Sequence, residues 1–255
     1  MNLILMSTPN NSAQWMLFLL NKYSKMFFQG TWLTLYIAVL GTFIGFILGF
    51  ALGVLGDAKI NKYDNFFKKL LIRFFKIISA VYVEVFRDTP MIVQAMVIYF
   101  GLRTFGVEIT PIPAGILVTF LNTGAYMSET VRAGINSIDL GQREGAYALG
   151  MSPLKTMFVV VLPQAFRNII PEMANMFLTN LKMTSVLNVI GISELFMVAK
   201  TVGGVYYKYF EAYLVIAVIY FVLCFVFNRL FLLMEKKLKG KNDYVLAVEF
   251  MDDGQ

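Results

Sequence analysis

The sequence predicts an all-α polytopic membrane protein with five transmembrane helices. Hydrophobic residues make up 58% of the chain, and the mean hydropathy of +0.67 lies far above that of a soluble globular domain. A helix that crosses the bilayer needs about 20 mostly apolar residues. Such segments lie at about residues 31–56, 77–102, 109–128, 171–191 and 210–234. The alternative, a soluble helical protein with buried helices, does not explain apolar segments of this length.

Residues 1–29 precede the first predicted span. No Lys or Arg comes before Lys22, so the charged start of a secretory signal is missing, and Trp15–Leu20 is too short to cross a membrane. We expect an extracytoplasmic segment at the membrane surface, with a short interfacial helix and a disordered leader as equal alternatives.

The first span carries glycine at every fourth position. Glycine at this spacing removes side-chain bulk from one stripe of a helix, so the backbone of another helix can approach closely. We expect the stripe to pack against another span, in this chain or in a partner; a helix that slides during gating is the alternative. The glycines are Gly41, Gly45, Gly49 and Gly53.

The second span contains three charged residues, Glu84, Arg87 and Asp88, directly before Thr89-Pro90. A lone charge at mid-bilayer costs roughly 2.5–3.5 kcal/mol on insertion scales, so charged residues within spans usually face protein or water. We expect these three to form a polar network, and Pro90 to bend or to start the membrane helix.

The third and fourth spans also contain polar residues. Glu129 and Arg132 share a helix face and are expected to pair, either structurally or as part of an inner gate. Lys182 is expected to pair with Glu129 or with carbonyls of a broken helix, or instead to contact a ligand carboxylate or line a translocation path. The candidate path and gate residues are Asn122, Thr123, Glu129, Arg132, Asn180, Lys182, Thr184 and Ser185.

Basic residues set the predicted orientation. They are concentrated in the connections after the first and third spans and in the tail, residues 235–255. The positive-inside rule therefore places the N-terminus outside and the C-terminus in the cytoplasm. The net charge of +6 is assigned to topology and to contact with anionic membrane lipid, and not to nucleic acid.

The orientation places a long connection, residues 134–166, in the cytoplasm. A short helix is predicted at 142–149, where Gly150 can end it in a left-handed conformation. Ser152 and Pro153 are suited to start a second helix. Two short helices joined at a glycine form a compact knob, which is a surface suited to another protein. Leu162-Pro163 is predicted to break or bend the second helix.

The residue inventory argues against an enzyme. The chain has no histidine and a single cysteine, Cys224, so it lacks the commonest general base and any His/Cys cluster for a metal. No Gly-x-x-x-x-Gly-Lys-Ser/Thr loop is present to hold a nucleotide phosphate. We expect no metal site, no cofactor and no ATP hydrolysis on this chain.

The long connection resembles the cytoplasmic coupling loop of ABC importer permeases, which runs Glu-Ala-Ala, three residues, Gly, nine residues, Ile, one residue, Leu-Pro. The residues that match it are Glu144, Ala146, Gly150, Leu162 and Pro163. Gly145 and Val160 depart from it. The resemblance implies that Glu144 makes a charged contact with an ATPase, that Gly150 forms the turn, and that Ala146, Tyr147 and Leu149 form the docking face.

Other motifs resemble the polar amino-acid (histidine/glutamine-type) branch of these permeases. They lie at Tyr82–Pro90, Gly124–Ile135 and Lys182–Val186, and the resemblance covers roughly Gly30–Leu233. Asp88 departs from the Gly or Asn that is more frequent in that branch.

This second resemblance implies a type I importer permease in a bacterial plasma membrane, paired with an identical or related permease subunit. The implied partners are a cytoplasmic ABC ATPase dimer, which holds ATP and Mg, and an extracytoplasmic amino-acid-binding protein. The alternative is a secondary carrier or channel that uses Lys182, Glu129 and Arg132 as its relay and needs no ATPase.

Overall fold

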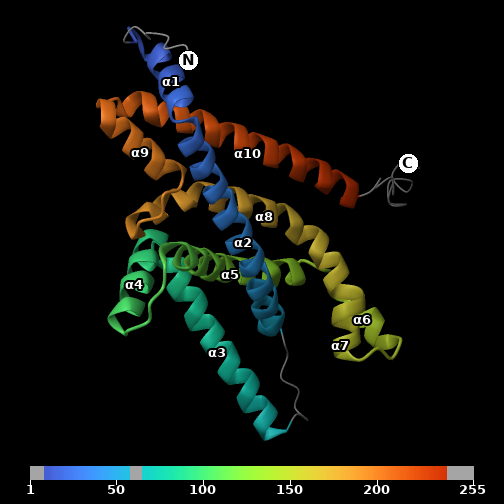
Figure 1. The fold of residues 1–255 in the computed structure, drawn as a ribbon. Helices are drawn as coiled ribbons and strands as arrows, with labels where there is room; N and C mark the ends of the chain where they lie inside the picture. The colour runs from blue at the N-terminus through green and yellow to red at the C-terminus, as the bar shows by residue number, and fades with distance from the viewer. Residues whose placement is uncertain (1–8, 58–64, 240–255) are drawn as a thin grey trace, which may run out of the picture.

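The computed structural model describes residues 9–57 and 65–239, and every regular element within these ranges is a helix (Figure 1). This agrees with the predicted all-α class. Lys59 and Lys62, which contributed to the predicted orientation, and the tail from residue 240 lie outside the described residues.

Helix α1 (Ser12–Lys22) precedes the first long helix. The Asn11 side chain caps it by accepting a hydrogen bond from the Gln14 amide. Its C-terminal Lys22 donates to the Tyr206 hydroxyl at 2.6 Å, and this contact raises the pKa of Lys22. Of the two alternatives for residues 1–29, a helix is present over Ser12–Lys22, and it packs on α9 (Leu195–Tyr206) and α10 (Tyr209–Lys239).

The centre of the fold is the pair of α2 (Ser24–Asp57) and α5 (Pro111–Asn136). All four glycines of the stripe on α2 face α5. A Cβ built on each would fall 2.5–2.6 Å from a side-chain atom of α5, so the two backbones lie closer than any larger residue permits. The α5 residues that meet these glycines are Thr119, Thr123, Met127 and Val131. They also recur at every fourth position, so a ridge of side chains on α5 fills the groove that the glycines leave on α2.

The predicted second span, residues 77–102, is two helices. α3 (Phe66–Asp88) ends before Thr89, which is extended, and α4 (Met91–Thr104) begins after Pro90. Proline disfavours a helical conformation in the residue before it and lacks the N–H that would continue the ladder, so the helix ends here. The expectation that Pro90 starts a helix matches this arrangement; a single helix over the whole span does not.

The long connection contains α6 (Leu140–Ala148) and α7 (Pro153–Thr156), and it continues through a π-helical turn, η1 (Met157–Val161), into α8 (Leu162–Met183). The predicted fourth span starts at Pro171, but α8 runs through this proline. A proline removes one backbone hydrogen bond, and that loss does not end a helix whose other turns are packed.

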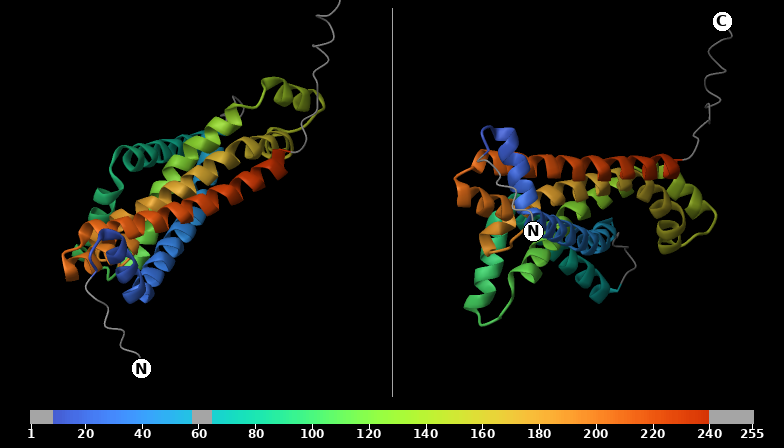
Figure 2. Two further views of the ribbon diagram at one scale, coloured as in Figure 1. Left: turned by 90° about the horizontal axis from the view of Figure 1, so that it is seen from above. Right: turned by 45° about the horizontal axis from the view of Figure 1, so that its top comes forward.

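A 3-10 turn, η2 (Thr184–Ile190), follows α8, and Gly191 then adopts a left-handed φ of 86°. Helix α9 starts at Leu195, and its direction differs by 57° from that of the preceding helical segment. Sequence analysis assigned no helix to Leu195–Tyr206, because its 12 residues are too few to form a span. In the left view of Figure 2, α5, α8 and α10 lie side by side.

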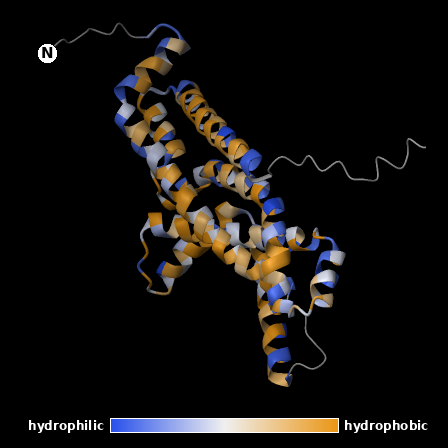
Figure 3. Ribbon diagram, turned by 90° about the vertical axis from the view of Figure 1, so that its right-hand side faces the viewer, coloured by the Kyte–Doolittle hydropathy of each residue, from blue (hydrophilic) through white to orange (hydrophobic). Residues whose placement is uncertain are grey.

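Hydrophobic residues dominate the long helices (Figure 3). Within the described ranges, length and composition qualify α2 and α10 as membrane-crossing helices. A third span is added if Pro153–Ile190 and Leu195–Tyr206 are taken as one bent segment, and α4 is a shorter apolar helix. The count of five spans stays a prediction.

Candidate functional site

The most distinctive surface element is the knob, which we define as Leu140–Thr156. Asp139 caps α6 by accepting from the Gly141 amide at 2.7 Å. Gly150 has a φ of 76°, and its amide donates to the Tyr147 carbonyl at 2.9 Å, which closes the turn after α6. Ser152 then caps α7, with Pro153 in the first turn. Local sequence thus fixes both helices of the knob and the turn between them.

The outward face of the knob combines one carboxylate with large apolar side chains. Glu144 is exposed, and its side chain makes no hydrogen bond or ion pair with the residues that the structure describes. Leu149 is 85% exposed, Leu154 is 73% exposed and Tyr147 is 46% exposed. Apolar side chains gathered on a protruding element, with a charge beside them, are typical of a protein-binding surface.

The inward face of the knob is formed by Arg143 and Ala146, which are buried. Sequence analysis placed Ala146 on the docking face, but it is only 5% exposed. Residues three apart share a helix face, so Ala146 follows Arg143 inward while Glu144 and Tyr147 stay outside. Ala146 therefore lies behind the exposed face of the knob.

Leu162-Pro163 does not break the chain of helices. Pro163 cannot donate a backbone hydrogen bond, and the preceding turn widens to a π-helix in which the Leu162 amide donates to the Met157 carbonyl. The Gln164 side chain donates to the Val160 carbonyl at 2.8 Å. The knob is consequently joined to α8 by helical backbone throughout.

Asn180, Thr42 and Thr123 connect three helices inside the protein. The Asn180 amide nitrogen donates to both threonine hydroxyls at 2.7 Å, and all three side chains are at most 2% exposed. Sequence analysis listed Asn180 and Thr123 as candidate path residues. The hydrogen bonds from Asn180 connect α8 to α2 and to α5.

The break between α3 and α4 is closed by two amide side chains. Gln94 of α4 donates to the carbonyls of Phe86 and Thr89, both at 2.9 Å. Asn122 of α5 donates to the Phe86 carbonyl and to the Gln94 side chain, both at 3.2 Å. These bonds satisfy carbonyls that a helix end leaves without partners. Sequence analysis missed Gln94, although an amide four residues after a proline was a usable signal.

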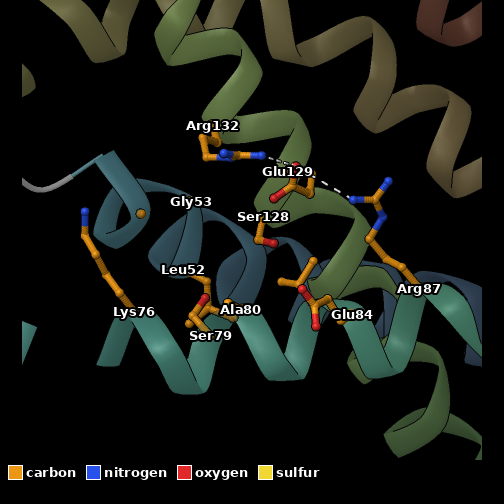
Figure 4. A pocket seen from close by; sticks show the side chains of 12 residues that line it. Leu52, Gly53, Lys76, Ser79, Ala80, Glu84, Arg87, Ser128, Glu129 and Arg132 are labelled. Carbon is orange, nitrogen blue, oxygen red and sulfur yellow. Dashed lines mark hydrogen bonds and ion pairs between the residues drawn. The ribbon is translucent and has the colours of Figure 1, made fainter. Parts of the chain in front are cut away.

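A charged pocket of about 410 Å³ lies among α2, α3 and α5. Figure 4 shows Glu129 between two arginines: Arg132 donates a hydrogen bond to Glu129, and Arg87 lies 3.7 Å from the same carboxylate oxygen. Lys76 and Glu84 line the same pocket. The predicted pair of Glu129 and Arg132 is present, and Arg87 joins it from α3.

Lys182 does not pair with Glu129. Among the residues that the structure describes, no carboxylate lies within ion-pair distance of its amine. It is exposed on α8. Thr184 and Ser185 donate to carbonyls of the preceding turn, those of Leu181 and Lys182.

Lys182 belongs to a polar stripe on α8. The stripe members recur at intervals of three or four residues, which places them on one side of a helix. A polar stripe on a helix of a membrane bundle faces a water-filled path or another subunit, since lipid offers polar groups no partners. The exposed members are Gln164, Asn168, Glu172, Asn175, Thr179 and Lys182.

Comparison with known proteins places this architecture among transport proteins. Residues 70–240 match the family described as binding-protein-dependent transport system inner membrane component. The arginine transport system permease protein ArtQ of Bacillus subtilis (strain 168) is 37% identical over 84% of this chain and 93% of its own length. The putative glutamine transport system permease protein GlnP of Rickettsia conorii is 32% identical, over 87% and 97% of the two chains.

A solved structure agrees with the sequence matches. The crystal structure of an amino acid ABC transporter with histidines superposes with a TM-score of 0.76. The two chains are 36% identical, and the match covers 86% of this chain and 96% of the other.

Proposed function

Because the chain belongs to the family of binding-protein-dependent transport system inner membrane components, we propose that it is the permease subunit of an ATP-driven ABC importer that carries a polar amino acid. The relatives named for arginine and glutamine transport support this substrate class. They are named permease proteins, and the chain is a transport subunit and not an enzyme.

The observation that carries the ATP-driven part of the proposal is the knob. It holds an exposed carboxylate, Glu144, beside exposed apolar side chains on an element that leaves the bundle. Such a surface fits a groove on a cytoplasmic ABC ATPase dimer, which would bind the ATP and Mg that this chain has no motif to hold. Closure of the ATPase pair would then push the knobs of two permease subunits together.

The polar stripe of α8 supports a second permease subunit, identical or related. Two copies that face each other through this stripe would enclose a polar path between them and keep Asn175, Thr179 and Lys182 away from lipid. The remaining candidate path and gate residues, Glu129 and Arg132 with Arg87, would lie beside that path at the end nearer the knob. An extracytoplasmic amino-acid-binding protein would deliver the solute at the opposite end.

The proposal fixes the orientation. The knob must meet a cytoplasmic ATPase, so the C-terminus of α10 lies on the cytoplasmic side and α1 on the outer side of the bacterial membrane. The basic residues predict the same orientation by the positive-inside rule.

Copurification tests the ATPase contact. The tagged chain is extracted gently from its native membranes, as wild type and as Glu144→Arg, and the bound proteins are assayed for ATP hydrolysis. We expect an ATPase subunit to copurify with the wild type. With Glu144→Arg, we expect the ATPase subunit to be lost or its ATP hydrolysis to be uncoupled from transport. Uptake into vesicles without ATP, with no ATPase bound to the wild type, would favour the carrier alternative. That alternative relies on Lys182 and Glu129, which form no pair within the described structure.

A further inference from the structure

We propose that the ion pair of Arg143 and Asp57 is the link that carries displacement of the knob to α2, which the short backbone connection between α5 and α6 does not reach directly. This inference rests on the proposed function, because it assigns a role in coupling to a residue that does not itself contact the ATPase. Arg143 is thus a positioning residue, and its effect is separable from docking.

The link is short and mostly shielded from water. The Arg143 Nη1 lies 3.2 Å from the Asp57 Oδ2, and both side chains are close to 10% exposed. An ion pair with so little exposure is screened far less by salt than a surface pair. Removal of one partner leaves the other charge buried and uncompensated, which makes this contact more costly to break than the exposed pair of Arg132 and Glu129.

One guanidinium reaches two helices from the knob. Besides Asp57 at the last described residue of α2, Arg143 donates through Nη2 to the Ile135 carbonyl in the last turn of α5, at 3.3 Å. A cation beside the last turn of α5 also interacts favourably with the negative end of that helix. Arginine can make both contacts because its planar group presents several donors in fixed directions, whereas lysine presents one centre.

The two helices held by Arg143 behave as one unit. The glycines of α2 lie against side chains of α5 along their common length, so neither helix can shift without the other. A movement of α6 that is transmitted through Arg143 therefore reaches the whole central pair, including the part that lines the charged pocket.

The residues proposed to dock on the ATPase and the residue proposed to form the link lie on opposite faces of α6. Glu144 and Tyr147 are exposed, whereas Arg143 is 9% exposed. A change at Arg143 can therefore leave the docking face intact while it loosens the knob from α2. A purely structural role would lower stability without altering how much solute moves for each ATP hydrolysed.

The test uses the assembled complex in proteoliposomes, with uptake and ATP hydrolysis measured together. For Arg143→Gln and for Asp57→Asn we expect the ATPase to copurify as with wild type, and the solute carried per ATP to fall by about tenfold. The ratio of the double variant Arg143→Gln/Asp57→Asn should fall no further than that of Arg143→Gln alone, because the change at Arg143 already removes the contact with Asp57. Arg143→Lys keeps the charge but loses one of the two contacts. Its ratio of solute carried to ATP hydrolysed should therefore lie between those of the wild type and Arg143→Gln.

The control is Lys236→Gln, which removes an exposed positive charge from the end of α10, outside the knob, and should keep the wild-type ratio. Monodispersity and melting temperature identify a variant that fails to fold. If Arg143→Gln does not fold, the solute carried per ATP by Arg143→Lys is used to test the link. If every folded variant kept the wild-type ratio of solute to ATP, or if the losses in the double variant were additive, the proposed role of the ion pair would be contradicted. The proposed function as a permease subunit would stand. No ATPase bound to the wild type would instead contradict the proposed function.

Discussion

A Cβ built on Gly45 of α2 falls 2.5 Å from the Cβ of Thr123 on α5. The same threonine accepts a hydrogen bond from Asn180 of α8. Close packing between two helices and the polar connection to a third therefore meet at one residue, in the middle of the bundle.

We expect Gly45→Ala to destabilise the protein by about 1–3 kcal/mol, because the added methyl group has no space beside Thr123. Thermal melting of the purified protein in detergent measures the effect. The matched control is Gly101→Ala in α4, where a Cβ meets nothing within 4 Å; alanine there should be neutral or stabilising. Equal melting temperatures for the two variants would contradict the close packing.

Asn180→Ala should also lower stability. Interhelical hydrogen bonds in membrane proteins contribute on average about 0.6 kcal/mol each, so the loss of two gives about 1 kcal/mol, plus the cost of the cavity. Asn175→Ala, on the exposed stripe of the same helix, is the control and should leave the melting temperature unchanged. If Asn180→Ala altered solute affinity but not stability, a path role would be favoured over the interhelical one.

Gln94→Leu should destabilise the junction of α3 and α4 by about 1–3 kcal/mol, because the Thr89 carbonyl loses its side-chain donor and the Phe86 carbonyl keeps only Asn122. The side chain has nearly the same size, so packing is largely kept. Gln164→Leu, which removes a single exposed bond to the Val160 carbonyl, serves as the comparison. A chemical denaturation series that ranks Gln164→Leu as the more harmful change would contradict this assignment.

Gly150→Ala should strain the knob, since a left-handed conformation costs a residue with a Cβ about 1–2 kcal/mol. The expected result is weaker retention of the ATPase on a tagged column. Gly145→Ala, on the adjacent helix with open space around its Cβ, should retain it as wild type does. Equal retention of the ATPase by both variants would show that the turn does not set the docking surface.

Lys182→Gln should leave stability unchanged, because the amine has no ion pair among the described residues. If Lys182 contacts a charged solute, the loss of about 1.5–3 kcal/mol should reduce uptake tenfold or more. Parallel measurement of melting temperature and uptake separates the two effects. A lowered melting temperature with normal uptake would identify Lys182 as structural.

The sequence was sufficient for the all-helical class, for the glycine stripe and for the turn at Gly150, because each depends on local spacing or on the backbone preferences of one residue. It was not sufficient for α9, whose 12 residues are fewer than a span needs. The break at Thr89-Pro90 was only one of two alternatives, because proline can bend a helix as well as start one.

The hydrogen-bond partners of polar side chains were harder to predict than the positions of polar residues within the spans. Asn122, Thr123, Asn180 and Lys182 were predicted as polar residues within spans, and the structure shows that the first three make hydrogen bonds with other helices. Which side chain meets which depends on the rotation of each helix about its axis, and a single sequence does not specify that angle. Asp57 and Arg143 illustrate the same limit, since 86 positions separate them in the chain.

The pairing of α2 with α5 has a consequence for biogenesis. Of these two helices α2 is synthesised first, and α3 and α4 leave the ribosome before any of α5 does. Until α5 arrives, the glycine face of α2 must be covered by lipid, by the insertion machinery or by another chain. Folding of the core therefore waits for the third apolar segment to enter the membrane, and a chain truncated before residue 136 would leave that face without its native partner.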